Sequence, residues 1–319
     1  MKLVLFGGAF DPPHIGHVTA AETTARELRP NMVLWMPSKI PPHKKKAVTA
    51  PEHRLAMCRI AAENVSDLEI NTPLSGYTVD TVARLLELYP GAEIWLLVGE
   101  DMFDTLPTWK DSERLLSMCN VKPVTRDDNS STKLRLHLAA GKGKDRLPDG
   151  VYDYIQTHKL YTLRTLLSPK RYLHTMGTAN TAKALALRYG ADIKHAETAA
   201  LLHDITKEED QLKLCKMYDI MPTAFELSAP KVLHAKTAAA LAEELDMPPE
   251  VVSAIRRHTT GSAEMSVLDK VIYLADFIEP FRKPHHGLDK LRVLAWEDLD
   301  AAMGYALELS DLFIKGVIK

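Results

Sequence analysis

The sequence predicts two domains of different fold class, a doubly wound α/β domain with a parallel sheet followed by an all-α domain. In the first half, short apolar runs of strand length alternate with helical segments, as in parallel sheets covered by helices. From about residue 170 onward, long segments rich in Ala, Leu, Glu and Lys follow one another without strand alternation. We expect the α/β domain over residues 1–161, a linker over 162–169 and the helical domain over 170–319.

Composition and charge favour a globular cytoplasmic protein. Hydrophobic residues make up 46% of the chain and charged residues 26%, and the formal net charge is -2, so we expect no nucleic-acid partner. Cys58, Cys119 and Cys215 form no CxxC pair, which favours reduced thiols over a disulfide framework. The apolar start of the chain is too short for a membrane segment, and we expect no membrane contact.

Five strand-like runs in the first half have the length of buried strands, and each precedes a loop or a helical segment. They cover residues 3–6, 33–36, 68–71, 94–98 and 121–124. We expect the first helix over residues 18–28 and a closing helix over residues 151–161. This alternation is what predicts the doubly wound sheet.

The first strand leads into a loop that is suited to phosphate. Gly7 and Gly8 end the strand, and the first helix begins shortly after the loop. Glycines allow backbone N–H groups to approach a phosphate, and a helix N-terminus favours negative charge. His14 and His17 flank Gly16, so both imidazoles can face the same oxyanion. We therefore expect a nucleotide phosphate site here.

The string Gly7-Gly8-Ala9-Phe10-Asp11-Pro12-Pro13-His14-Ile15-Gly16-His17 resembles the signature of the nucleotidylyltransferase superfamily. Segments 41–44, 76–81, 97–101, 106–110 and 129–135 resemble its nicotinate-nucleotide adenylyltransferase branch. The resemblance implies that His14 and His17 stabilise the leaving pyrophosphate as catalytic residues, and that Mg²⁺ enters with ATP. The nucleotide-binding residues that it implies are Gly7, Gly8, Phe10, His14, His17, His43, Lys44, Thr78, Gly99, Asp101, Trp109, Ser131, Thr132 and Arg135.

The chain departs from this branch after the last expected strand. Where the family usually has a further helix and a strand that helps to seat adenine, this chain has only Thr125-Arg126-Asp127-Asp128. The sheet is expected to lose an edge strand, and the adenine pocket one wall. We therefore expect ATP binding to persist and transfer of adenylate to nicotinate mononucleotide to be weak or absent.

The second half contains a set of residues of metal-ligand type. His203 and Asp204 follow two leucines in an expected buried helix, where adjacent polar side chains need a partner. Four further residues in helical surroundings supply such partners, namely His174, His234, His258 and Asp276. Four imidazoles and two carboxylates can bind divalent metal through nitrogen and oxygen, without a thiolate.

Segments 171–175, 202–207, 233–234, 257–261 and 269–280 resemble the bacterial HD-superfamily symmetrical diadenosine tetraphosphate hydrolases. The resemblance implies two metal ions and cleavage of diadenosine tetraphosphate to two ADP; iron is favoured, and manganese, cobalt or zinc also suit these ligands. His174, His203, Asp204 and Asp276 suffice for one ion, so His234 and His258 imply a second ion that shares Asp204 as a bridge. Replacing either of these two histidines with Ala should remove that ion.

Three further residues are expected to face the phosphates of the substrate. Lys207 would neutralise a phosphoryl oxygen as a catalytic residue, Arg282 would reach a phosphate, and Gly261 would let the backbone approach the ligand. The surplus positive charge of two divalent ions would attract phosphate and lower the pKa of a bound water.

The favoured interpretation is a bifunctional enzyme. One alternative is a monofunctional hydrolase whose N-terminal domain binds nucleotide without catalysis, which the shortened segment after residue 124 favours. A second is an HD phosphohydrolase for another nucleotide, because metal ligands define a reaction class and not the leaving group. A third, a metal-bound sensor, is disfavoured by the intact ligand set. The sequence leaves the oligomeric state open, a homo-oligomer included.

Overall fold

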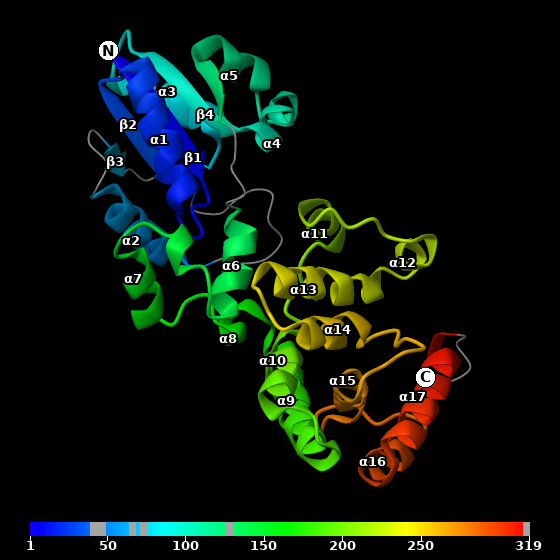
Figure 1. Ribbon diagram of the computed structural model, residues 1–319. Coiled ribbons are helices and arrows are strands. Elements are labelled where there is room, and N and C mark those ends of the chain that lie inside the picture. Colours follow the sequence, from blue (N-terminus) through cyan, green and yellow to red (C-terminus); the bar gives the residue numbers. More distant parts are fainter. Residues whose placement is uncertain (39–48, 64–67, 71–75, 125–129, 315–319) are drawn as a thin grey trace. The chain divides into compact units, whose positions relative to one another are not determined.

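The computed structural model describes residues 1–38, 49–63, 68–70, 76–124 and 130–314, and its chain divides into two compact units (Figure 1). The α/β unit spans Met1–Tyr161, and the helical unit spans Thr162–Lys319. Each unit has its own secondary structure and its own core.

The α/β unit is built on a parallel sheet with the strand order β3-β2-β1-β4-β5. Its strands are β1 (Lys2–Gly8), β2 (Met32–Pro37), β3 (Leu68–Ile70), β4 (Glu93–Gly99) and β5 (Asn120–Val124). In the centre of the sheet, Val4 of β1 lies between Val33 of β2 and Trp95 of β4. The five strands fall on the five strand-like runs, which confirms the predicted doubly wound α/β class.

Helices cover both faces of the sheet because the apolar side chains alternate between the faces. On one face, Val4 and Phe6 of β1 share a core with α1 (Ile15–Leu28), α2 (Pro51–Ala62), α6 (Ser131–Ala139) and α7 (Val151–Thr157). On the other face, Leu5 shares a core with α3 (Thr78–Leu88), the 3-10 helix η1 (Leu106–Thr108) and α5 (Ser112–Met118). The remaining short helices of this unit are α4 (Glu100–Phe103) and η2 (Lys144–Arg146).

The closing helix of the α/β unit is shorter than the sequence predicts. It ends at Thr157, and Lys159 and Tyr161 adopt left-handed backbone conformations with φ near 50°. These turns return the chain to the core, where Tyr161 is buried and its hydroxyl donates a hydrogen bond to Asp11 Oδ1 at 2.8 Å. Packing of one distant aromatic ring thus overrides helical propensity at the end of the unit.

The helical unit contains no strand among its described residues, which confirms the predicted all-α class. Its helices are α8 (Leu163–Leu166), α9 (Pro169–Tyr189), α10 (Ile193–Leu202), α11 (Gln211–Met217), α12 (Ala224–Ser228), η3 (Pro230–Val232), α13 (Leu233–Glu244), α14 (Pro249–Arg257), α15 (Val267–Ile278), α16 (Leu288–Glu297) and α17 (Leu299–Ile314). Helix α8 lies inside the segment that was expected to be a linker. Among the helices of the described chain, none is both long enough and apolar enough to cross a membrane.

Small side chains bring the central helices of this unit close together. Helix α9 packs against α10 and α15, and α14 packs against α10, α13 and α15. At the α9 and α10 faces the buried residues include Ala182, Ala186, Ala196 and Ala199. Because alanine adds little bulk, the backbones can approach closely. Polar side chains on these helices are therefore held at short range.

Candidate metal centre and nucleotide-binding loop

The six residues predicted as metal ligands converge in the core of the helical unit, although they come from five helices or helix ends. His174 lies on α9, His234 on α13 and Asp276 on α15, and His258 is the C-cap of α14. The four histidines and Asp204 are 7% exposed or less. Five separate elements thus deliver side chains to one buried point.

The pair His203 and Asp204 lies beyond its helix rather than within it, contrary to the sequence-based expectation. Helix α10 ends at Leu202, with His203 as the C-cap. The chain then turns tightly, because Ile205 N–H donates to Leu202 O and Lys207 N–H donates to Asp204 O. This turn places the Asp204 and Lys207 side chains side by side, with Lys207 Nζ 3.3 Å from Asp204 Oδ1.

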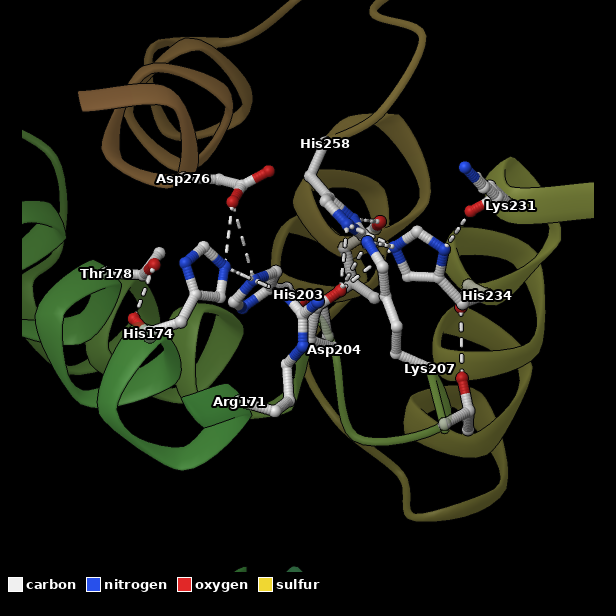
Figure 2. A network of polar contacts seen from close by, with 12 residues as sticks. Arg171, His174, Thr178, His203, Asp204, Lys207, Lys231, His234, His258 and Asp276 are labelled. Carbon is white, nitrogen blue, oxygen red and sulfur yellow. Dashed lines mark hydrogen bonds and ion pairs between the residues drawn. The ribbon is translucent and has the colours of Figure 1, made fainter. Parts of the chain in front are cut away.

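The carboxylate of Asp204 lies between two groups of imidazoles (Figure 2). Its Oδ2 is 3.5 Å from His174 Nε2 and 3.4 Å from His203 Nε2. Its Oδ1 is 2.9 Å from His234 Nε2 and 3.7 Å from His258 Nε2. Each oxygen therefore serves a different pair of histidines, as a carboxylate that bridges two cations would.

The histidine rings are oriented by hydrogen bonds at their outer nitrogen. The Nδ1 atoms of His203, His234 and His258 lie 2.6 Å from the carbonyl oxygens of Ala200, Lys231 and Ile255. A carbonyl can only accept, so Nδ1 donates and a neutral ring keeps its lone pair on Nε2. That lone pair points into the centre, which is the tautomer that a metal ligand requires.

His174 differs from the other three histidines because a buried carboxylate replaces the backbone carbonyl. Its Nδ1 is 3.1 Å from Glu279 Oε1, and its Nε2 is 2.9 Å from Asp276 Oδ1. Burial lowers the pKa of His174, but the hydrogen bonds of Asp204, Asp276 and Glu279 outweigh burial and raise it to about 10. His174 therefore sits where negative charge is concentrated, and a cation is favoured there.

Both aspartates remain ionised in this buried setting. Burial alone would raise the pKa of Asp204, yet the charge and hydrogen bonds of the neighbouring histidines hold it well below its usual range. For Asp276 burial again raises the pKa, and the Arg282 guanidinium and the His174 hydrogen bond lower it more strongly. His234 is neutral, because burial lowers its pKa to about 4.

The donor set fits divalent cations. Two overlapping groups, His174 with His203 and Asp276, and His203 with Asp204 and His258, each offer ligand atoms within 4.8 Å of one another. Asp204 Oδ1 is buried and accepts no hydrogen bond in the described part of the chain. A buried carboxylate oxygen is costly unless positive charge compensates it, which the Lys207 ammonium at 3.3 Å does in part and a bound cation would do further. Imidazole and carboxylate ligands without a thiolate suit iron, manganese, cobalt and zinc.

Three basic side chains of the helical unit contact the two aspartates. Lys207 Nζ is 3.0 Å from His234 Nε2, and Arg282 Nη2 is 3.5 Å from Asp276 Oδ1. Arg171 Nη1 pairs with Asp204 Oδ2 and enters the cluster from α9 (Figure 2). All three are partly exposed, so they can meet an anionic ligand from solvent. Lys207 and Arg282 were expected here, whereas Arg171 was missed.

Glu279 is a second residue that the sequence-based prediction missed. It is 1% exposed, and its Oε2 accepts a hydrogen bond from Phe281 N–H at 2.6 Å. A spacing signal existed, because Glu279 follows Asp276 by three residues and Gly177 follows His174 by three. On facing helices this spacing places the carboxylate against the glycine and the histidine.

Gly261 has a structural explanation that differs from the expected approach to ligand. Its φ is +66°, a region that favours glycine, and a Cβ there would lie 3.1 Å from Leu307 of α17. The glycine lets the chain leave α14 and pack against the C-terminal helix.

In the α/β unit, the loop after β1 lies beside the start of α6. Arg135 Nη1 donates to the Asp11 carbonyl at 2.9 Å, and Ser131 Oγ donates to the Pro12 carbonyl at 3.3 Å. Arg135 Nη2 also donates to Thr132 Oγ1 at 3.3 Å. The structure therefore brings together two predicted phosphate-binding motifs that are more than a hundred residues apart in the sequence.

His14 and His17 face each other at the N-terminus of α1. His14 is the N-cap, its N–H donates to His17 Nδ1 at 3.2 Å, and the two ring centroids are 3.7 Å apart. Phe10 lies below them, stacked on Trp35 with 4.8 Å between centroids, and its ring fills the space beside Gly8. Two imidazoles at a helix N-terminus form an arrangement that favours phosphate.

The remaining predicted nucleotide-binding residues lie along the ends of the central strands. Gly7 and Gly8 end β1 and Gly99 ends β4, at the neighbouring strands where the strand order reverses, which is where ligands bind in such sheets. Thr78 begins α3, and Trp109 Nε1 donates to Thr105 Oγ1 at 3.1 Å. Lys110 joins these two motifs through Asp80 at 3.4 Å. His43, Lys44 and the Asp101 side chain lie outside the described residues.

The first unit combines a doubly wound sheet with a glycine- and histidine-bearing loop, which is typical of nucleotidyltransferases. The second brings together four histidines and two aspartates, residues of metal-ligand type. Comparison with protein families agrees. The cytidylyltransferase-like family matches residues 5–168, and the HD domain family matches residues 171–280. The chain belongs to the cytidylyltransferase-like family over its first half and carries an HD domain in its second half.

Curated relatives cover one or both units. The probable nicotinate-nucleotide adenylyltransferase/Ap4A hydrolase of Mycoplasma genitalium is 27% identical over 354 residues, covering 100% of this chain and 99% of that protein. The probable nicotinate-nucleotide adenylyltransferase of Gemmatimonas aurantiaca is 35% identical, covering 50% of this chain and 92% of that protein. The symmetrical bis(5'-nucleosyl)-tetraphosphatase of Bacillus subtilis is 38% identical, covering 49% of this chain and 85% of that protein. The chain is therefore an enzyme that combines nucleotidyltransferase and HD-hydrolase units.

Proposed function

We propose that the helical unit hydrolyses diadenosine tetraphosphate symmetrically to two ADP at the cluster around Asp204. The observation that carries this proposal is the division of one carboxylate between two histidine groups, with Oδ2 3.4 Å from His203 Nε2 and Oδ1 2.9 Å from His234 Nε2. Such a bridge is characteristic of two-metal phosphohydrolase chemistry. The similarity of this half to a symmetrical tetraphosphatase supports the substrate class.

The residues that would hold two divalent ions are His174, His203, Asp204, His234, His258 and Asp276. When bound, such ions would supply Lewis acidity toward phosphoryl oxygens and lower the pKa of a water molecule. The chain's own part is to present imidazole nitrogens and ionised carboxylates in fixed orientations. The Nδ1 hydrogen bonds to backbone carbonyls and to Glu279 provide that orientation.

Basic side chains would position the tetraphosphate. Lys207, Arg171 and Arg282 each contact a carboxylate of the cluster and remain partly exposed, so each can turn to a phosphoryl oxygen. In the reaction, a water oxygen bonds to one of the two central phosphorus atoms, and the bond from that phosphorus to the central bridging oxygen breaks. The water protons are shared between the two products, so each product is ADP.

Hydrolysis in ¹⁸O-labelled water tests the proposal directly. Purified full-length protein loaded with Mn²⁺ is incubated with diadenosine tetraphosphate, and products are separated by anion-exchange chromatography and mass spectrometry. Two ADP per substrate, with one ¹⁸O in one of them, support symmetrical cleavage. Formation of ATP and AMP would contradict it. The Asp204→Asn variant is the matched control, because it keeps the shape of the side chain and removes its charge.

A second candidate substrate class is other nucleotides with a phosphoanhydride or phosphomonoester, since the ligand set alone does not select the leaving group. A panel containing dinucleoside triphosphate and pentaphosphate, ADP, GDP and nucleoside monophosphates separates these classes. If one of these compounds has a higher kcat/KM than diadenosine tetraphosphate, that compound is the preferred substrate and replaces diadenosine tetraphosphate in the proposal.

For the α/β unit we infer ATP binding at the loop between β1 and α1. The proximity of Arg135 to Asp11 and the facing rings of His14 and His17 support it, together with the position at the switch point of the sheet. Transfer of adenylate to nicotinate mononucleotide would follow by alignment and charge stabilisation, since the acceptor's own phosphate is the nucleophile. We expect this transfer to be weak, because in the described chain no strand lies between β5 and α6.

A further inference from the structure

The cluster around Asp204 has two unequal halves. We define the first half-site as His174, His203 and Asp276 with Asp204 Oδ2, and the second half-site as His234 and His258 with Asp204 Oδ1. The first half-site offers four donor atoms, of which two are carboxylate oxygens. The second offers three donor atoms, of which one is a carboxylate oxygen. A cation therefore meets more ligands and more negative charge in the first half-site.

A buried carboxylate supports only the first half-site. Glu279 Oε1 lies 3.1 Å from His174 Nδ1, whereas the Nδ1 atoms of His234 and His258 face backbone carbonyls. A carboxylate is the stronger acceptor, and it makes the imidazole that it binds a better metal ligand. Glu279 does not reach the centre itself. It is a positioning residue for His174.

Gly177 makes room for this support. A Cβ at Gly177 would lie 2.5 Å from Glu279 Oε2 and 3.0 Å from the Phe281 ring. The same oxygen accepts a hydrogen bond from Phe281 N–H at 2.6 Å, which fixes the carboxylate against α9. Any side chain at position 177 would displace Glu279 from its place behind His174. The absence of a side chain at Gly177 is therefore what allows Glu279 to contact His174.

Basic side chains lie against ligand atoms in both half-sites. Arg171 and Arg282 pair with the carboxylates of Asp204 and Asp276 in the first half-site. In the second half-site, Lys207 Nζ lies 3.0 Å from the ligand nitrogen His234 Nε2 and 3.3 Å from Asp204 Oδ1. An ammonium group at that distance from a ligand atom repels a cation that binds there. The inequality between the half-sites therefore rests on their donor atoms and on Glu279, while Lys207 opposes a cation in the second half-site.

We propose that the two half-sites bind divalent cations in a fixed order, with the first half-site filled first and held by Glu279, and the second filled later and opposed by Lys207. This inference rests on the proposed metal centre and adds an assignment of affinity to each half. In this order of binding, the ion in the second half-site is the one that exchanges with metal ions in solution. The activity of the protein would then follow the free metal concentration through the second half-site.

Mn²⁺ titration of the metal-stripped full chain, with free Mn²⁺ measured by electron paramagnetic resonance, tests the order without any substrate. Wild type should show two steps whose dissociation constants differ by at least about tenfold. Glu279→Gln should weaken the first step by roughly 10- to 100-fold and leave the second step nearly unchanged. Lys207→Ala should strengthen the second step by about tenfold and leave the first unchanged.

Gly177→Ala provides an independent route to the same effect, because it displaces the Glu279 carboxylate without changing its chemistry. Gly304→Ala is its matched control, since a Cβ at this helical glycine of α17 meets nothing within 4 Å. Asp269→Asn controls for the loss of a buried carboxylate, because Asp269 lies on the same helix and binds Ser253 and Arg257 instead. Circular dichroism spectra and thermal unfolding in EDTA establish that each variant is folded.

Weakening of the first step alone in both Glu279→Gln and Gly177→Ala supports the proposal. Two identical steps in wild type, or equal weakening of both steps in Glu279→Gln, would overturn it. If hydrolysis of diadenosine tetraphosphate proceeds while the steps are identical, the inequality fails and the proposed function stands. If no Mn²⁺ binds at all, the metal centre itself fails, and both conclusions fall together.

Discussion

Tyr161 and Asp11 join the two ends of the α/β unit through a buried hydrogen bond of 2.8 Å. The hydroxyl of Tyr161 donates to Oδ1 of a carboxylate that is 0% exposed and lies in the loop after β1. The backbone carbonyl of the same Asp11 accepts from Arg135. The phosphate loop, the start of α6 and the end of the unit thus meet at a single residue.

We expect Tyr161→Phe to destabilise the α/β unit by about 1–3 kcal/mol, because Asp11 would remain buried with one donor fewer. Three of the four tryptophans, Trp35, Trp95 and Trp109, lie in this unit. In a Trp296→Phe background, urea unfolding followed by tryptophan fluorescence reports on this unit alone. Tyr305→Phe in the helical unit is the control, and its transition should match that of the background protein.

The strands could be predicted because short strand-like runs, such as the apolar residues 94–98, alternate with longer helical segments along the first half. The end of α10 could not be predicted, because residues 203–210 contain no glycine or proline that would mark a helix end, and only the tertiary contacts of Asp204 require the turn. The end of α7 was missed for a similar reason, since Tyr161 is drawn into a distant core.

The convergence of the six predicted ligands could be anticipated because histidine and aspartate are unusual on apolar helix faces and here occur in a recognisable order. Glu279 and Arg171 could not be assigned in the same way. A glutamate just beyond a helix end and an arginine in a first turn are ordinary on solvated surfaces. Only the packing of α15 against α9 shows that they serve the cluster.

Lys207→Ala should keep the cluster intact and lower kcat for diadenosine tetraphosphate hydrolysis. Because the variant loses an ammonium that meets the reacting phosphate, the activation free energy should rise by roughly 2–4 kcal/mol. Steady-state kinetics at saturating Mn²⁺ measure this effect apart from metal affinity. Lys183→Ala is a suitable control, because Lys183 pairs with Glu197 at 2.8 Å and has no contact with the cluster ligands. Unchanged kcat in Lys207→Ala would remove Lys207 from the catalytic residues.

The cysteines should resist alkylation in the native protein. Burial raises the pKa of Cys119 to about 11, and burial also raises that of Cys58 and Cys215. A raised pKa leaves less thiolate at a given pH, so at pH 8 Cys119 should react with iodoacetamide about 100-fold more slowly than a free cysteine of pKa about 8.5. Its rate should rise with pH toward 11. Mass spectrometry with and without urea checks this, and rapid native labelling would contradict it.

Adenylyl transfer by the α/β unit should be weak while ATP binding persists. His14, His17 and Arg135 are arranged at the loop, whereas no described strand follows β5 to complete the adenine side of the sheet. Isothermal titration with ATP and Mg²⁺ measures binding, and chromatography measures nicotinate adenine dinucleotide from nicotinate mononucleotide and ATP. His17→Ala is the matched variant. Robust product formation that is abolished by His17→Ala would refute the expected weakness.

Asp204 should be the least replaceable residue of the chain. Its two oxygens lie 3.4 Å from His203 Nε2 and 2.9 Å from His234 Nε2, so its single negative charge stands between both half-sites. Two divalent ions within roughly 4 Å of each other repel by about 4 × 4 kcal/mol at an effective dielectric of 20. Removing the charge that separates them should therefore expel one ion.

In Asp204→Ala we expect metal analysis to give at most one ion per chain and hydrolysis to fall by at least about two orders of magnitude, because two-metal stabilisation is lost. Asp204→Asn keeps the size of the side chain and isolates the effect of charge, so it should lose the same ion. Inductively coupled plasma mass spectrometry and hydrolysis assays on the same samples check both outcomes. Two retained ions with near-normal turnover would remove Asp204, and the turn after α10, from the catalytic centre.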